Sequence, residues 1–114
     1  MAGEKKGMIA VFKMDKNMNT AEWRERFNSG YQDVMALKGL FFKSWWINQH
    51  KGEWGGFCIF NSNEDLEEYL TSDLWLKEIP QMYGNVKPEV TIVDVGPIIC
   101  MKRVTEGGKT WLTE

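Results

Sequence analysis

The sequence predicts an α+β fold in which a four-stranded antiparallel sheet carries two helices on one face. Short apolar runs rich in β-branched and aromatic residues alternate with two segments of helical periodicity, in the order β-α-β-β-α-β. The two runs in the middle are separated only by a short polar turn, which is typical of a hairpin. A chain of 114 residues is also the usual size of one domain.

The first strand and the first helix are defined by apolar periodicity. Met8–Met14 is a short apolar run, and a polar turn follows it. Asn19 and Glu22 form a helix-capping pattern, which predicts a helix from Thr20 to Leu37 that ends at Gly39. The inward face of this helix is expected to hold Trp23, Phe27, Tyr31 and Val34.

The hairpin and the second helix come next. Leu40–Asn48 and Trp54–Phe60 are the hairpin strands, and Gly55-Gly56 predicts close backbone approach or a bulge. Ser62 opens a second helix in which leucines share one face. A break is expected at Thr71-Ser72-Asp73, and Pro80 weakens the last turn.

The last predicted strand is Glu89–Val95, which lies between Pro88 and Gly96-Pro97. Residues 1–104 are expected to form the domain, with an extended arm from about residue 97, and residues 105–114 a polar tail. This order of elements defines the ferredoxin-like arrangement.

Both faces of the predicted hairpin are aromatic, which has a consequence for assembly. Strand side chains alternate, so Trp45 and Trp46 point to opposite faces of the sheet. Two helices cover one face only, and a second copy of the same sheet is the simplest cover for the other. We therefore expect a homodimer.

Composition and charge exclude several classes of function. A net charge of −2, from 14 basic and 16 acidic residues, disfavours nucleic acid as a partner. No stretch has the length of a membrane span, and we expect no membrane partner and a cytoplasmic protein. Cys58 and Cys100 are expected to be reduced, and one histidine gives no basis for a metal site.

Three groups of residues carry a family resemblance. Gly39-Leu40 with Lys43 and Trp45, then Gly55-Gly56 with Phe60, then Tyr69-Leu70 resemble the YdhR-type family of the dimeric α+β-barrel superfamily. The resemblance implies a monooxygenase without cofactor, acting on a small aromatic or polyketide-like substrate. Such a substrate, as an anion, itself gives an electron to O2, so the protein supplies a dry pocket and a cation. Cys58 stands where the family pattern leads us to expect a tyrosine.

Three residues are candidates for catalysis. Lys43 lies in an aromatic strand, where its ammonium either holds a phenolate or pairs with a carboxylate such as Asp94. His50 is in the hairpin turn, as a solvated residue or a proton carrier. Tyr69 is expected to pack in the core or to orient a ligand through its hydroxyl.

The position of the substrate pocket stays open between two alternatives. Trp23 and Tyr31 are further candidates to line it. A pocket between sheet and helices is expected to use Ser44, Trp46, Cys58 and Tyr69. A pocket inside the dimer barrel is expected to use Lys43, Trp45, Phe57 and Asp94.

Other functions share the same fold. A haem-binding protein needs an axial ligand, for which His50 is badly placed. An RNA-recognition motif has the same strand order, but the acidic residue and glycines of Glu53–Phe60 disagree with its basic, aromatic third strand. A dimer that binds a small ligand without turnover is the remaining alternative.

Overall fold

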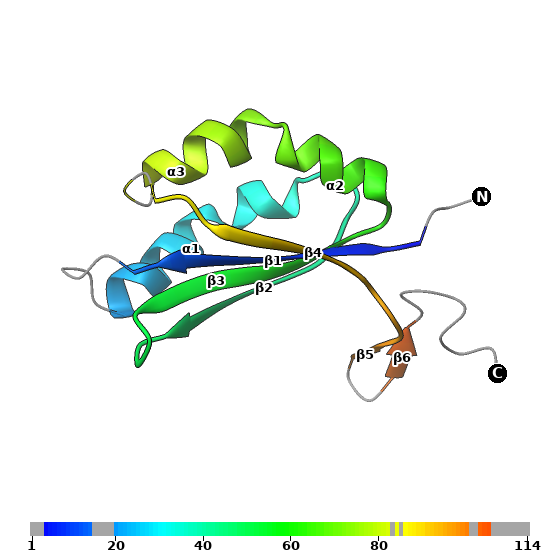
Figure 1. Ribbon diagram of the computed structural model, residues 1–114, viewed down its shortest axis with the longest axis horizontal. Coiled ribbons are helices and arrows are strands. Elements are labelled where there is room, and N and C mark those ends of the chain that lie inside the picture. The colour runs from blue at the N-terminus through cyan, green and yellow to red at the C-terminus, as the bar shows by residue number, and fades with distance from the viewer. Residues whose placement is uncertain (1–3, 15–19, 83, 85, 101–102, 106–114) are drawn as a thin grey trace.

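The computed structural model describes residues 4–14, 20–82, 84, 86–100 and 103–105, and it has the predicted element order. Neighbouring strands of its four-stranded sheet are antiparallel, in the order β2-β3-β1-β4, and the helices lie together on one side of the sheet (Figure 1). The fold class is therefore confirmed. The elements are β1 (Lys6–Lys13), α1 (Thr20–Met35), β2 (Leu40–Asn48), β3 (Glu53–Phe60), α2 (Asn63–Leu70), η1 (Leu74–Glu78), α3 (Ile79–Met82) and β4 (Glu89–Asp94).

The end of α1 depends on a glycine. Gly39 has a φ of +74°, in the left-handed region that favours glycine at helix ends. A Cβ at this position would lie 2.2 Å from the Oδ2 atom of Asp65, so the turn also packs closely on α2. The predicted end of this helix is confirmed to within two residues. Asn19, the expected cap at its beginning, lies outside the described residues.

The second helical segment is broken where the sequence predicted. Ser62 caps α2, because its hydroxyl accepts a hydrogen bond from the backbone N–H of Asp65 at 3.1 Å. After α2 the segment continues as the π-helical turn η1, in which the N–H of Ile79 bonds to the carbonyl of Leu74. Pro80 follows directly and has no N–H to donate. This irregular helix presents apolar side chains of both η1 and α3 to the sheet.

The residues after β4 form a hairpin instead of the expected extended arm. β5 (Ile98–Cys100) pairs with β6 (Arg103–Thr105) in a separate two-stranded sheet. This hairpin lies beyond the end of β4, on the side away from the helices (Figure 1). The expected arm is wrong in this respect, because the chain reverses within a few residues. The expected polar tail, apart from Thr105, lies outside the described residues.

The two faces of the sheet are buried to different degrees. The buried core lies on the face under the helices, which we call the helix face. The opposite face, called the open face, carries Ile9, Val11, Trp46 and Phe57, all of them half-buried. The main members of the core on the helix face are Met8, Ala10, Phe12, Trp23, Trp54, Cys58, Phe60, Leu66 and Tyr69.

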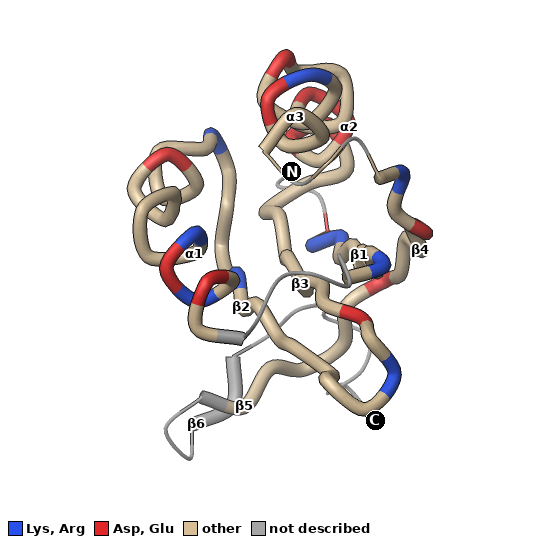
Figure 2. The backbone as a smooth tube through the Cα atoms, turned by 90° about the vertical axis from the view of Figure 1, so that its left-hand side faces the viewer, with Lys and Arg blue, Asp and Glu red and all other residues tan. Residues whose placement is uncertain are grey.

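Charged residues of both signs follow one another along the helices and strands (Figure 2). None of the described helices combines the length and the apolar character that a membrane crossing needs.

Candidate functional site

A cavity lies on the helix face, between the sheet and the helices. Its volume is about 50 Å³. Three of the four strands, β1, β2 and β3, contribute to its floor, through Phe12, Lys43, Trp45, Trp54 and Gly56 among others. Its sides come from α1, which contributes Arg26, Phe27, Gly30, Asp33 and Val34, and from the second helical segment, which contributes Tyr69, Leu74, Trp75, Ile79 and Met82.

Six aromatic residues line the cavity. Trp45 stacks on Phe27 with ring centroids 5.4 Å apart and an interplanar angle of 8°. Phe12 stacks on Trp54 at 4.2 Å with the same angle. Trp75 meets the edge of Phe12 at 6.4 Å. Flat, rigid and apolar walls of this kind suit a planar ligand.

The register of the hairpin places Lys43 on the helix face. Four residues link the two strands, so Asn48 pairs with Glu53, and counting back along the ladder pairs Lys43 with Cys58. The Nζ atom of Lys43 lies 3.3 Å from the Sγ atom of Cys58 and 5.2 Å from the centre of the Trp45 ring. Among the described residues, no carboxylate lies within 4.0 Å of this ammonium. The cavity thus contains a positive charge against an aromatic wall.

The paired glycines of β3 make room for one long side chain on each face. A Cβ at Gly56 would lie 2.7 Å from the Nζ of Lys43 on the helix face. A Cβ at Gly55 would lie 2.5 Å from the Cζ2 atom of Trp46 on the open face, and 2.1 Å from the backbone oxygen of Ala10. The predicted close approach at Gly55-Gly56 is confirmed. These glycines allow a lysine and a tryptophan to lie flat across the middle of the sheet.

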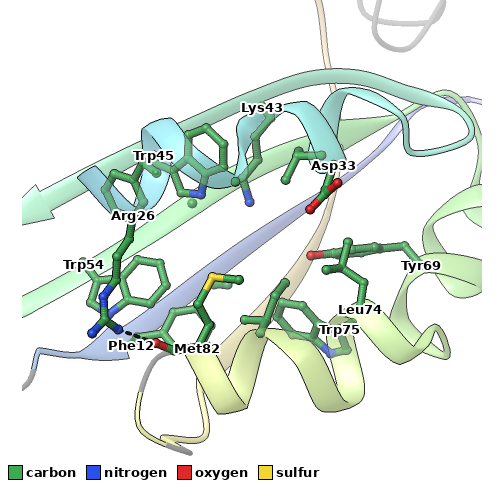
Figure 3. Close-up of a pocket in the computed structure, with 16 residues that line it drawn as sticks. Phe12, Arg26, Asp33, Lys43, Trp45, Trp54, Tyr69, Leu74, Trp75 and Met82 are labelled. Atoms are coloured by element: carbon green, nitrogen blue, oxygen red, sulfur yellow. Dashed lines mark hydrogen bonds between the residues drawn. The ribbon is translucent and has the colours of Figure 1, made fainter. Parts of the chain in front are cut away.

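Tyr69 and Asp33 face the same space as Lys43. Figure 3 shows the hydroxyl of Tyr69 and the carboxylate of Asp33 pointing toward one another, with the ammonium of Lys43 beside them. Burial raises the pKa of Tyr69 well above its usual range, and the nearby Cys58 raises it further. Tyr69 is therefore a neutral phenol at physiological pH, able to donate a hydrogen bond but unsuited to act as a base.

A hydrogen bond joins the two helical walls at one end of the cavity. The guanidinium of Arg26, on α1, donates to the backbone oxygen of Met82, the last residue of α3 (Figure 3). The same guanidinium lies 5.6 Å from the centre of the Trp23 ring. Arg26 therefore ties α1 to α3 across the space between them.

The expected grouping of pocket residues was wrong. Lys43 and Trp45 lie on the helix face with Cys58 and Tyr69, whereas Ser44, Trp46 and Phe57 lie on the open face. Alternation correctly predicted which residues of one strand share a face. The register between β2 and β3 was wrong by one residue, and such an error exchanges the two faces of β2. The four-residue turn contained the information needed, because its length fixes the register of the hairpin.

The expected partner of Lys43 was also wrong. Asp94 forms its ion pair with Lys6, at the far end of the neighbouring strand pair. The ammonium of Lys43 contacts the sulfur of Cys58 instead. The edge position of β4 explains the difference, because β1 and β3 separate it from β2.

Other predicted site residues lie away from the cavity. His50 is exposed in the turn between β2 and β3, and it is not part of the cavity lining. Trp23 is 1% exposed and packs below the lining, with its ring 4.8 Å from that of Trp54. Tyr31 was expected to point inward but is 43% exposed. It lies near the end of α1, where Met35 is 72% exposed and the helix packs least closely.

Two open hollows adjoin the cavity. A hollow of about 380 Å³ between α1 and β2 shares Val34, Lys43 and Trp45 with it, and Tyr31 lines this hollow. A second hollow, of about 530 Å³, separates the irregular helix from β4 and shares Phe12, Trp75 and Ile79. The cavity is thus the narrow middle of a longer depression along the helix face.

Sequence reasoning missed several residues of the site. Arg26 and Asp33 lie on α1 at positions that helical periodicity assigns to the sides of the helix. Trp75 belongs to the π-helical turn, where the register of an ordinary helix no longer holds. The signal available for Trp75 was the break at residues 71–73 followed by Pro80. Nothing in the sequence distinguished Arg26 and Asp33 from other surface charges.

Comparison with known proteins identifies the fold. No protein-family model matches the sequence, and no curated protein sequence matches it. SnoaB, a cofactor-independent oxygenase from Streptomyces nogalater, matches the structure with a TM-score of 0.63 at 8% identity, over 82% of this chain and 94% of SnoaB. A Caulobacter crescentus protein named "putative antibiotic biosynthesis monooxygenase" gives 0.64 at 16% identity, over 82% of this chain and 91% of that one.

A third match is Rv0793 from Mycobacterium tuberculosis, with a TM-score of 0.60 at 20% identity over 78% of this chain and 92% of that protein. The chain therefore shares the ferredoxin-like α+β fold of these structures, and its structural neighbours include proteins named as monooxygenases. At these identities the likeness establishes the fold alone.

Proposed function

We propose that the protein is a monooxygenase without cofactor, acting on a small, electron-rich aromatic substrate in the helix-face cavity. One observation carries this proposal: the ammonium of Lys43 projects into an aromatic cavity, with no carboxylate within 4.0 Å of it in the described part of the chain. Such a site is complementary to a planar organic anion, such as a phenolate. The likeness of fold to SnoaB supports the same class of reaction.

The chemistry follows from the charge on the substrate. Lys43 stabilises the phenolate, whose ring is electron-rich enough to give an electron to O2 directly. The neutral hydroxyl of Tyr69 is a hydrogen-bond donor for an oxygen atom that gains negative charge during the reaction. One oxygen atom enters the ring and the other leaves as water, so a phenol and O2 give a quinone and H2O. The aromatic walls exclude bulk water from the intermediate.

The size of the cavity indicates how a substrate binds. A volume of about 50 Å³ is smaller than an aromatic ring system needs, and the adjoining hollow of about 380 Å³ supplies the remaining space. Lys43 and Trp45 line both spaces. We propose that the substrate lies across their boundary, with its anionic edge at Lys43. α1 can move away from β2 at this boundary, because Trp23 is the only fully buried side chain of α1 among those described.

The test is aerobic turnover of simple hydroquinones and naphthols by the purified protein. We expect oxygen consumption above the uncatalysed rate, and one atom of ¹⁸O in the product when ¹⁸O2 is supplied. Binding of the same compounds is measured separately, by the quenching of tryptophan fluorescence. This measurement distinguishes a protein that binds and oxidises the compounds from one that only binds them. Binding without incorporation of ¹⁸O contradicts the oxygenase and leaves the alternative, a protein that binds a small ligand without turnover. The enclosed volume of about 50 Å³ is the observation that favours this alternative.

The homodimer is a further part of the proposal. The open face exposes the apolar side chains of Ile9, Val11 and Phe57 in part, and Phe42 is 39% exposed beside them. A second copy of this face would cover them and would close the barrel that names the superfamily. Sedimentation analysis at micromolar concentration is expected to give twice the chain mass of 13.3 kDa. The narrower assignment to the YdhR-type family is also part of the proposal, and it rests on the residues around Lys43, Trp45 and Gly55-Gly56.

A further inference from the structure

Lys43 and Cys58 form an unusual pair on the helix face. They are direct cross-strand neighbours in the register of β2 and β3, so their side chains leave the backbone side by side. The Nζ atom lies 3.3 Å from the Sγ atom. An amine and a thiol in contact are the two groups that can be joined by oxidation. From this geometry we propose that Lys43 and Cys58 form a reversible covalent bond when the protein meets hydrogen peroxide.

The reaction has two balanced steps. Peroxide takes two electrons from the sulfur of Cys58, so that the thiol becomes a sulfenic acid and one water leaves. The Lys43 ammonium releases a proton to solvent, and its nitrogen attacks the sulfur. The nitrogen–sulfur bond forms, the sulfur–oxygen bond breaks, and the hydroxyl leaves as a second water. The product is a sulfenamide, and overall a thiol, an amine and peroxide give one nitrogen–sulfur bond and two waters.

The surroundings favour this bond over further oxidation of the sulfur. Cys58 is 2% exposed and is not part of the cavity lining, whereas Lys43 lines the cavity with its Nζ atom 3.3 Å from the sulfur. A small oxidant arriving through the cavity therefore meets the two groups together. Gly56 holds the pair in place, because the end of the lysine side chain occupies the space where any other residue would have a Cβ. A sulfenic acid formed here has the nitrogen of Lys43, 3.3 Å from the sulfur, as a nucleophile in contact with it.

The bond would act as a switch on the site. It removes the positive charge of Lys43 from the cavity, and a thiol reductant restores it. This consequence for activity rests on the proposed function. The bond itself does not, because it is detected by mass and not by turnover. A protein that binds a ligand without turnover would form it equally well.

The experiment uses trypsin, which cleaves after free lysine. In a Cys100→Ser background Cys58 is the one thiol in the chain. Peroxide is added to the folded protein, which is then denatured with a thiol-blocking reagent and digested. Without the bond, cleavage after Lys43 separates Gly39–Lys43 from Ser44–Lys51. With the bond, we expect an uncleaved Gly39–Lys51 joined to Gly52–Lys77, two hydrogens lighter than the sum of the two peptides. Dithiothreitol should reduce the nitrogen–sulfur bond and release the two peptides from each other.

Two matched variants test the geometry. Lys43→Arg keeps the positive charge but removes the amine, so we expect oxidised Cys58 without a joined peptide. Gly56→Ala keeps both reacting groups and moves the lysine end away from the sulfur, so the yield of joined peptide should fall at least about fivefold. Circular dichroism checks that each variant is folded. In the Cys100→Ser protein, which keeps both Lys43 and Cys58, two outcomes would show that the proposal is wrong. In one, Cys58 is recovered as a free thiol; in the other, it is recovered as sulfinic or sulfonic acid with normal cleavage at Lys43.

Discussion

The two faces of the sheet are built from the same strands but differ in what covers them. The helix face has a closed core and a cavity with Lys43 and Tyr69 in its lining. The open face has half-buried apolar side chains, and none of the described helices lies above it. Neighbouring residues divide between the two: Trp45 stacks on α1, whereas Trp46 lies over Gly55 on the other side. The helix face can be explained within a single chain, whereas the open face would be covered in the proposed homodimer.

The largest expected effect comes from two phenylalanines of β3. Phe60 is 0% exposed on the helix face, whereas Phe57 is half-buried on the open face. Phe60→Ala should lower the free energy of unfolding by about 3–5 kcal/mol, the usual cost of a large cavity in a core. Phe57→Ala should cost only about 1–2 kcal/mol in the separate chain, because less of the ring is buried there. Urea unfolding at several protein concentrations measures both.

The dependence of unfolding on protein concentration then distinguishes the stability of the single chain from that of the dimer. If the open face is the dimer interface, Phe57→Ala should also raise the dissociation constant at least about tenfold, whereas Phe60→Ala should not do so directly. Equal losses for both variants at the lowest protein concentration would show that the faces are equally buried in one chain. The difference in burial between the helix face and the open face would then be contradicted.

The second prediction compares Lys43 with its neighbour on β2. Lys43→Met removes the cation from the cavity and keeps a flexible apolar side chain of similar length. A charge-assisted hydrogen bond contributes about 1.5–3 kcal/mol, so kcat/KM for a phenolic substrate should fall about 10- to 100-fold. Ser44→Ala, on the open face, should leave kcat/KM within about twofold. An equal fall in both variants would indicate general damage to the strand, and no fall in Lys43→Met would remove the cation from the mechanism.

How much of this could be predicted from the sequence depended on the kind of information needed. Local patterns predicted the order of elements, the end of α1 before Gly39, the beginning of α2 after Ser62 and the break before Leu74. All of these are confirmed. The division of one strand into two faces also follows from a local pattern, namely alternation. These predictions held because neighbouring residues alone determine them.

The composition of the site required long-range information. Lys43 was placed opposite the wrong neighbours because register depends on the hairpin as a whole, and one residue of error exchanges the faces. Arg26 and Asp33 could not be predicted, because their role comes from α3 and Tyr69 lying opposite α1. The surface exposure of Tyr31 follows from how α1 sits on the sheet, which its periodicity does not contain.

The third prediction uses the pKa of Tyr69 as a measure of helix-face burial. In the unfolded chain its pKa is about 10, and burial raises it in the folded protein. Below about pH 10 both states hold the proton and stability is unaffected. Above this pH the unfolded state releases the proton first, so stability falls by up to about 1.4 kcal/mol per pH unit.

Tyr69→Phe removes this contribution to the pH dependence. The difference in unfolding free energy between the natural sequence and Tyr69→Phe should therefore be constant below about pH 10 and shrink above it. The other tyrosines are present in both proteins and cancel. Tyr31→Phe is the matched control for the loss of a tyrosine hydroxyl, since this residue is 43% exposed. Parallel stability curves for Tyr69→Phe and the natural sequence up to pH 11.5 would show that Tyr69 is open to water.

The smallest expected effect is at His50, which belongs to neither face. It lies in the turn joining β2 to β3, exposed and outside the lining of the cavity. A proton carrier must come within hydrogen-bond reach of the substrate, directly or through one water. His50→Gln should therefore change kcat by less than twofold, which corresponds to less than about 0.4 kcal/mol, and leave the pH profile of kcat/KM unchanged. A tenfold fall would mean that the turn folds over a bound substrate, and the helix face would then no longer contain the whole site.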